Sequence, residues 1–187
     1  GCDPGGTRKP SVDPDDSGNG RSKTKRYFHL TALAENTVGY RNLTKLSSQA
    51  WIDGFWAKPR ADHELLAAHG DGLILLTGCL GGEVANELLA GNFRAACDVV
   101  DRLRAAVGKD SVYVEVMDHG IAAQRRIIPD LYRLADELGV KTVVTNDSHY
   151  VSQGDAHTHD ALLAVQTGCL LHDNTRFYRE GLTKAGL

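Results

Sequence analysis

The chain is poor in aromatic residues and has no long apolar run. Only 6% of its 187 residues are Phe, Trp or Tyr, and its longest apolar stretches have the length of single strands. A membrane span needs about 20 consecutive apolar residues, so no membrane partner is predicted, and no signal-peptide pattern is visible. The net charge of −3 indicates that the chain does not have a basic surface that binds nucleic acid strongly on its own.

The chain also lacks a CxxC motif. Its four cysteines, Cys2, Cys79, Cys97 and Cys169, are widely separated, so a disulfide framework is not expected. Reduced cysteines are typical of a cytoplasmic protein, and we expect that location. Cys97 falls on the apolar stripe of a predicted helix, which favours a core position for it.

Large apolar residues are nearly absent from residues 1–24, which are rich in Gly, Pro, Ser, Asp and Lys. Such a segment buries too little surface to offset the entropy of ordering, so a flexible loop or tail is predicted. The chain begins with Gly1 instead of Met, and we interpret it as a fragment. Residues 25–175 are expected to form the structured domain, and residues 176–187 a tail or the start of the next region.

After this segment, apolar runs of strand and helix type alternate along the chain. Strands are predicted at residues 27–33, 73–77, 112–117 and 142–145. Helices are predicted at residues 37–51, from a cap at Asp62 to Gly70, in a stretch ending near Gly91, and at residues 92–107. A further helix carries an apolar stripe from Ile127 to Leu138, which Pro129 kinks or divides. The last predicted helix begins at a Ser152–Asp155 capping box and runs through Val165. This rhythm predicts an α/β fold with a mainly parallel sheet.

Asp147 and His149 follow the strand predicted at 142–145. Residues i and i+2 of a strand point to one side, so both side chains can face one point just beyond the strand. A carboxylate and an imidazole together suit a divalent cation such as zinc, manganese or iron. The alternative is an ordinary turn, because Asn-Asp-Ser is common turn chemistry.

Two further strands place reactive residues at their carboxyl ends, where sites gather in parallel α/β folds. Cys79 follows one strand, and Asp118 with His119 follows another. Cys79 also fits a buried apolar position, and Asp118 is expected to cap the next helix, so His119 stays outside the ligand set. His29 lies early in its strand, which by itself favours a surface or core histidine.

The other histidines give weaker signals. His157 and His159 lie i and i+2 on a helix, so they face different directions and joint chelation is not expected. The remaining three, His63, His69 and His172, give no signal.

Six segments together resemble a known family. They are FHLTALAENTVGYRNLTKLSS, KPRAD, GLILLTGCLGGEV, DHG, TNDSHYV and HDALLAVQTG, between about Tyr27 and Asp173. In combination and order they resemble the PHP (polymerase and histidinol phosphatase) domain of the bacterial replicative DNA polymerase III α subunit. The resemblance implies part of a distorted (β/α)7 barrel whose strand ends hold up to three metal ions.

Carried over residue by residue, the resemblance implies four metal ligands: His29, Cys79, Asp147 and His149. It assigns no catalytic residue and no other cofactor. The family's His-x-His pair and its Glu, which come earlier in the chain, have no counterpart here, and residues 1–24 hold no histidine. We therefore expect the isolated chain to have weak or no exonuclease activity.

The resemblance implies a fragment of a DNA-directed DNA polymerase, a nucleotidyltransferase of DNA replication that uses Mg. In that family the PHP domain serves as a metal-dependent phosphoesterase, a 3′–5′ exonuclease type of proofreading module. The implied partners are the remainder of the α subunit, primer-template DNA and other replicase subunits, and the polymerase's catalytic aspartates lie outside this chain. Two alternatives remain: a free-standing phosphoesterase of the histidinol-phosphatase type, and a non-catalytic scaffold domain.

Overall fold

The computed structural model describes residues 27–55, 58–168 and 170–171. These residues fall into two units, one spanning Arg26–Asn146 and one that includes the residues from Asp147 onwards, and we treat each unit by itself. The tail predicted at residues 1–24 and the segment predicted at 176–187 lie outside the described residues.

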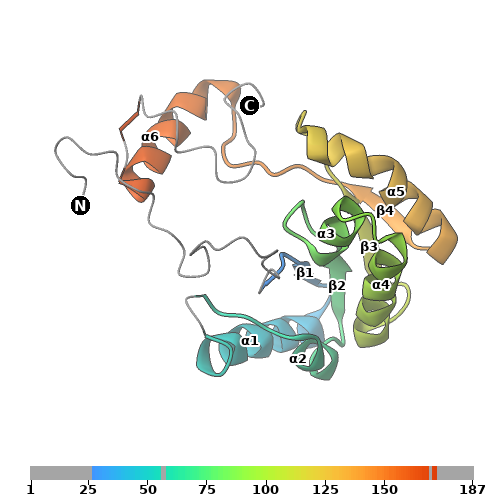
Figure 1. The fold of residues 1–187 in the computed structure, drawn as a ribbon. Coiled ribbons are helices and arrows are strands. Elements are labelled where there is room, and N and C mark those ends of the chain that lie inside the picture. The colour runs from blue at the N-terminus through green and yellow to red at the C-terminus, as the bar shows by residue number, and fades with distance from the viewer. Residues whose placement is uncertain (1–26, 56–57, 169, 172–187) are drawn as a thin grey trace, which may run out of the picture. The chain divides into compact units, whose positions relative to one another are not determined.

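The larger unit is built on a four-stranded sheet with the strand order β1-β2-β3-β4 (Figure 1). Its strands are β1 (Thr31–Ala34), β2 (Leu73–Leu76), β3 (Val112–Val116) and β4 (Lys141–Val144). Strands β2, β3 and β4 are parallel, and β1 pairs with β2 in the antiparallel sense. The predicted α/β architecture with a mainly parallel sheet is confirmed.

The first strand is shorter than predicted, and its direction matters for the site. It begins at Thr31, which lies opposite Leu76 at the carboxyl end of β2. Residues 27–30, the described residues before Thr31, therefore lie past the end of β2 and belong to no strand. Among these four, His29 forms an isolated bridge with Gly82. The prediction of a strand from residue 27 was wrong for this reason.

Six α-helices occur in the described part of the chain. They are α1 (Thr37–Ile52), α2 (His63–Ala68), α3 (Glu83–Leu89), α4 (Phe93–Val107), α5 (Ala122–Leu138) and α6 (Ala156–Thr167), the last preceded by a 3-10 turn at Gln153–Asp155. Two of the three predicted caps are confirmed. Asp62 accepts a hydrogen bond from the Leu65 N–H at 2.8 Å, and Ser152 forms a capping box with Asp155.

Helices α4 and α5 pack on β2, β3 and β4, and α3 packs on both helices (Figure 1). The fully buried side chains are aliphatic: Leu73, Leu75, Val84, Val100, Val112, Val114 and Leu134. Cys97 is 4% exposed within this core, as predicted. Pro129 does not divide α5, because Ile127 and Leu131 on either side of it are buried in the same core and hold the helix together.

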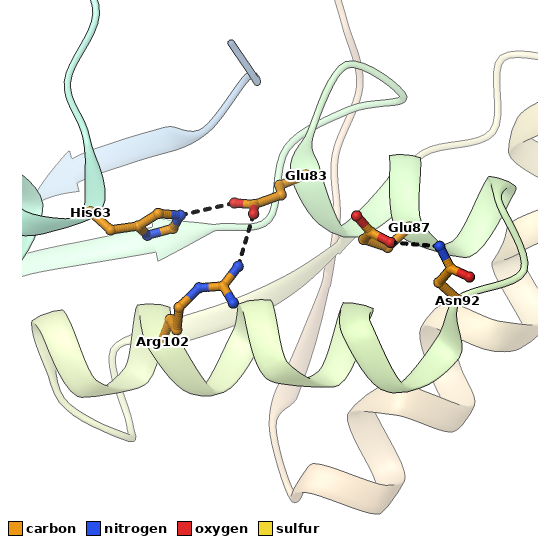
Figure 2. Close-up of polar contacts among 5 residues, drawn as sticks. All are labelled: His63, Glu83, Glu87, Asn92 and Arg102. Carbon is orange, nitrogen blue, oxygen red and sulfur yellow. Dashed lines mark hydrogen bonds and ion pairs between the residues drawn. The ribbon is translucent and has the colours of Figure 1, made fainter. Parts of the chain in front are cut away.

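A polar cluster joins three helices near the start of α3 (Figure 2). One carboxylate oxygen of Glu83 lies 3.0 Å from His63 Nε2 on α2, and the other accepts a hydrogen bond from Arg102 on α4 at 2.8 Å. At the other end of α3, Asn92 donates to Glu87 at 3.0 Å. These contacts fix α3, and therefore the loop that joins it to β2.

Candidate metal centre

Within the described residues of the larger unit, the polar side chains classed as buried gather at the carboxyl edge of the parallel strands. Among the described residues, Thr77, Glu115 and Gln124 are the buried polar side chains, at 2%, 4% and 5% exposure. Thr77 ends β2, Glu115 lies near the end of β3, and Gln124 lies in the first turn of α5. A small pocket lined by all three also borders Cys79. Buried polar groups require partners, so their contacts define the chemistry of this edge.

One contact at the edge joins two predicted ligands that are 50 positions apart. Cys79 Sγ lies 3.4 Å from His29 Nδ1. The antiparallel direction of β1 explains this contact, because it brings the amino end of β1 beside the carboxyl end of β2. The sequence analysis placed His29 at the wrong end of its strand for a site, because a mainly parallel sheet was predicted and the antiparallel direction of β1 was not.

The loop after β2 is shaped to hold this pair. Gly78 has a φ of 84°, in the left-handed region that favours glycine, and a Cβ there would lie 2.6 Å from the His29 carbonyl oxygen. A Cβ on Gly81 would lie 2.8 Å from His29 Nδ1. The Gly81 N–H donates to Cys79 Sγ at 3.3 Å, and the His29 N–H donates to the Gly81 carbonyl at 3.0 Å. Backbone contacts therefore lock the imidazole against the thiol.

The separation of the two donor atoms matches that of two ligands on one tetrahedral ion. With Zn–S near 2.3 Å and Zn–N near 2.05 Å, tetrahedral ligands lie about 3.6 Å apart. The observed 3.4 Å is close to this value. A thiol also fits as a weak hydrogen-bond donor to an imidazole at this distance, so the pair alone does not distinguish a metal site from a hydrogen bond.

Glu115 connects the ends of three strands. Its Oε2 accepts a hydrogen bond from the Gly78 N–H at 2.9 Å, and its Oε1 accepts one from the Thr145 hydroxyl at 2.7 Å. Its own N–H donates to the Thr77 hydroxyl oxygen at 2.9 Å. Gly78 directly precedes Cys79, and Thr145 comes two residues before Asp147. One buried carboxylate thus holds the two chain segments from which predicted ligands follow.

His119 is held in one tautomer at the end of β3. Gln124 Oε1 accepts from the His119 N–H at 2.8 Å, which identifies the other amide atom as Nε2, a donor to His119 Nδ1 at 2.9 Å. Nδ1 is therefore unprotonated, and Nε2 carries the proton that it donates to Asn146 Oδ1 at 2.5 Å. His119 thus ties the end of β4 to the end of β3.

Asp118 does not cap the next helix, contrary to the prediction. Ile121 occupies the cap position of α5, because Asp118 instead accepts a hydrogen bond from the Gly120 N–H at 2.8 Å. That backbone hydrogen bond holds the pKa of Asp118 below its ordinary value, and the Arg125 guanidinium, 3.3 Å away, lowers the pKa further.

The second predicted pair lies in the other unit. Asp147 and His149 come after the end of β4 and outside any strand. Their side chains nevertheless approach each other, with His149 Nδ1 3.8 Å from Asp147 Oδ1 and 2.9 Å from the Asp147 carbonyl oxygen. The His149 ring also contacts the His159 ring of α6, with centroids 5.3 Å apart.

The structure thus brings the four predicted ligands together as two pairs, one in each unit. In the part of the chain that it describes, no three His, Cys, Asp or Glu side chains gather closely enough to hold a metal ion. The donor set itself fits a divalent ion, since one thiolate, two imidazoles and one carboxylate are the ligand types and the number found in tetrahedral zinc sites. Within each pair, the donors face each other.

Sequence reasoning missed Glu115 and Gln124, although both carry a signal. Glu115 is a lone charge inside the apolar run VYVEVM, and such a charge requires a partner when it is buried. Gln124 lies three residues before Ile127 on the stripe that packs into the core, so its side chain was bound to be buried. Polar residues at positions expected to be apolar mark this edge.

Comparison with known proteins agrees with this architecture. Residues 10–119 match the PHP domain family. The chain is 43% identical over 170 residues to the DNA polymerase III subunit alpha of Mycobacterium tuberculosis, covering 90% of this chain and 14% of that protein. It is 47% identical over 143 residues to the protein of the same name from Treponema pallidum, covering 76% and 12%. The Deinococcus radiodurans protein of that name is 44% identical over 153 residues, covering 82% and 11%.

The chain therefore belongs to the PHP domain family. It is similar to the PHP region of DNA polymerase III alpha subunits, of whose length it spans about one seventh or less. PHP domains are metal-dependent, and the four residues predicted as ligands carry side-chain types that bind divalent ions. Within the described residues, none of the helices has the length and apolar character that crossing a bilayer requires.

Proposed function

We propose that His29, Cys79, Asp147 and His149 hold a divalent metal ion, and that the chain contributes this ion to a metal-dependent phosphoesterase site of the 3′–5′ exonuclease type. The contact of 3.4 Å between Cys79 Sγ and His29 Nδ1 is the observation that carries the proposal. A thiol and an imidazole from distant segments meet at the edge where a PHP domain would bind metal. Zinc, manganese and iron all suit this donor set.

We further propose that the four-stranded sheet is part of a distorted (β/α)7 barrel. Its two edge strands support this, since Leu33 on β1 and Val144 on β4 are 49% and 73% exposed. Exposed apolar side chains on unpaired edges are a liability that further strands would remove. In this proposal the described residues between 27 and 171 belong to the carboxyl-terminal portion of the domain predicted for residues 25–175.

The similarity to DNA polymerase III subunit alpha supports a role within a replicative DNA polymerase. The chain would then act in the cytoplasm together with the remainder of that subunit, primer-template DNA and other replicase subunits. Nucleotide addition, which uses Mg, would take place in parts of the subunit that lie outside the segment matched here.

The residues of the proposed metal site have different chemical roles. A bound divalent ion would supply Lewis-acid stabilisation of a phosphoryl oxygen and would lower the pKa of bound water toward about 7. Cys79 and Asp147 supply negative charge to hold the ion, and His29 and His149 supply neutral nitrogen ligands. His119 presents a single tautomer at the same edge as His29 and Cys79, because Gln124 holds its Nδ1 unprotonated.

Cobalt(II) binding to the 187-residue chain tests the metal site, because a cobalt–thiolate bond gives an intense charge-transfer absorption in the near ultraviolet. We expect this absorption in the wild-type chain and its loss in Cys79→Ala. His29→Ala is expected to weaken binding by at least tenfold, since it removes one of four ligands. Zinc should compete with cobalt and remove the absorption.

Cys97→Ala is the matched control, because Cys97 is also a free cysteine but is buried in the apolar core, away from the proposed ligands. It should keep the full absorption. A wild-type chain without a thiolate absorption, or a Cys79→Ala variant that retains it, would overturn the proposal. The Asp147→Asn variant shows whether the second pair contributes, through a weaker affinity with the thiolate absorption retained.

A further inference from the structure

We propose that Glu115 is a positioning residue of this metal site: it sets the carboxyl ends of β2 and β4 relative to each other, and so fixes the two segments of the larger unit from which Cys79 and Asp147 follow. This inference rests on the proposed function. Glu115 itself is not a ligand in this proposal. It acts through the two segments that its carboxylate holds.

The geometry of the sheet makes such a residue necessary. Neighbouring strands lie about 4.8 Å apart, so β2 and β4, with β3 between them, are separated by about 10 Å. Two ligands of one zinc ion lie less than about 4.5 Å from each other. Cys79 follows β2, and Asp147 follows β4. The positions of the two strand ends in the larger unit therefore set the points from which these two predicted ligands follow.

Glu115 lies on the strand between them and divides its two oxygens between the two ends. Oε2 accepts from the Gly78 N–H at 2.9 Å on the β2 side, and Oε1 accepts from the Thr145 hydroxyl at 2.7 Å on the β4 side. Because Glu115 is 4% exposed, water does not compete freely for these oxygens. Hydrogen bonds to a carboxylate are also shorter and stronger than neutral ones.

The position of Glu115 on its strand agrees with this role. Side chains alternate along a strand, and Val114 and Val116 belong to the core that the helices cover. Glu115 therefore points to the opposite face of the sheet, where a carboxylate adds nothing to the apolar core. Its own N–H is held by the Thr77 hydroxyl at 2.9 Å, which fixes the strand beneath the carboxylate.

Three variants separate positioning from charge. Glu115→Met keeps the approximate volume and removes both hydrogen bonds. Glu115→Gln removes the charge and can keep both contacts. The amide oxygen can accept from the Gly78 N–H, and the amide nitrogen can donate to the Thr145 hydroxyl, which then accepts a hydrogen bond instead of donating one. Thr145→Val removes only the β4 half of the link.

Cobalt(II) affinity of the 187-residue chain, followed by the thiolate absorption, is the main measurement. We expect Glu115→Met to weaken binding by about 10- to 100-fold, the range typical of residues that orient metal ligands. Glu115→Gln should restore the affinity to within about threefold of wild type, and Thr145→Val should fall between the two. Glu137→Met, which removes an exposed carboxylate on α5, is the matched control and should bind as wild type does.

Amide hydrogen exchange at Gly78 without metal gives a second readout. Exchange should be faster in Glu115→Met than in Glu115→Gln, since only the former leaves the Gly78 N–H without its acceptor. Equal cobalt affinity in Glu115→Met and Glu137→Met would overturn the inference. If Glu115→Met does not fold, unchanged affinity in Thr145→Val would overturn it instead. Absence of a thiolate absorption in the wild-type chain would instead contradict the proposed function.

Discussion

The apolar interior and the carboxyl edge of the larger unit use the same residue type in opposite ways. Cys97 lies in the interior, on α4, where burial raises the pKa of its thiol and keeps it protonated. Cys79 lies at the edge, where its sulfur contacts an imidazole and accepts a backbone N–H. The contrast shows that one cysteine packs in an apolar core while the other has polar neighbours.

The two regions also differ in what holds them together. The interior consists of fully buried aliphatic side chains, whose contribution to folding scales with buried area. The edge consists of a buried carboxylate, an amide and a hydroxyl, which hold strand ends through directed hydrogen bonds. Interior substitutions should therefore change stability most, and edge substitutions should change local geometry most.

Leu134→Ala should have the largest effect on stability. Leu134 is fully buried on α5, so truncation removes apolar burial and leaves a cavity, and the free energy of unfolding should fall by about 2–5 kcal/mol. Urea denaturation measures this change. The same substitution at Leu33, which is 49% exposed on β1, should cost less than half as much. Equal losses would mean that the interior does not dominate stability.

Gln124→Leu should have an intermediate effect that appears mainly in His119. The variant leaves the His119 N–H without its acceptor, at a cost of about 1–3 kcal/mol. It also removes the donor to Nδ1, so that the contact of Nε2 with Asn146 remains to favour one tautomer. In wild type, nitrogen NMR of the imidazole should show Nε2 protonated and Nδ1 unprotonated.

Gln124→Glu sharpens this test. A carboxylate can still accept from the His119 N–H, but its second oxygen cannot donate to Nδ1 and instead requires a proton there. The NMR spectrum should therefore change to a ring protonated at Nδ1. An unchanged tautomer in this variant would show that Gln124 does not control the ring.

The regular elements of the interior were predictable from periodicity. The stripe of Ile127, Leu131 and Leu134 repeats at helical spacing, and the caps at Asp62 and Ser152 are local in sequence. Such signals involve residues a few positions apart. The sequence could therefore place the helices and parallel strands to within a few residues.

The edge was less predictable because its contacts are long-range. The pairing of β1 with β2 depends on sheet topology, and without it His29 appeared to lie at the wrong end of its strand. The bridge from Glu115 to Gly78 and Thr145 spans 37 and 30 positions. Periodicity cannot reveal such contacts, although a lone charge in an apolar strand indicates that one must exist.

Asp118→Asn should have the smallest effect, because this carboxylate lies at the edge but is exposed to solvent. The Gly120 N–H, and then Arg125, lower its pKa in the folded state. Its stabilising contribution is therefore present at pH above its ordinary pKa of 3.8 and is lost as the pH falls through the lower folded value. Asp118→Asn should reduce stability slightly at neutral pH and not in strong acid, which urea unfolding at both pH values checks.

Arg125→Gln identifies the cause of the Asp118 shift. The backbone hydrogen bond is the larger cause, so the pKa of Asp118, followed by carbon NMR of its carboxyl group, should stay below 3.8 without the guanidinium. A return to the ordinary value would mean that the ion pair with Arg125 dominates. The outcome also bears on Glu115, whose carboxylate likewise accepts a hydrogen bond from a backbone N–H, that of Gly78. A backbone donor can stabilise a carboxylate without help from a neighbouring cation.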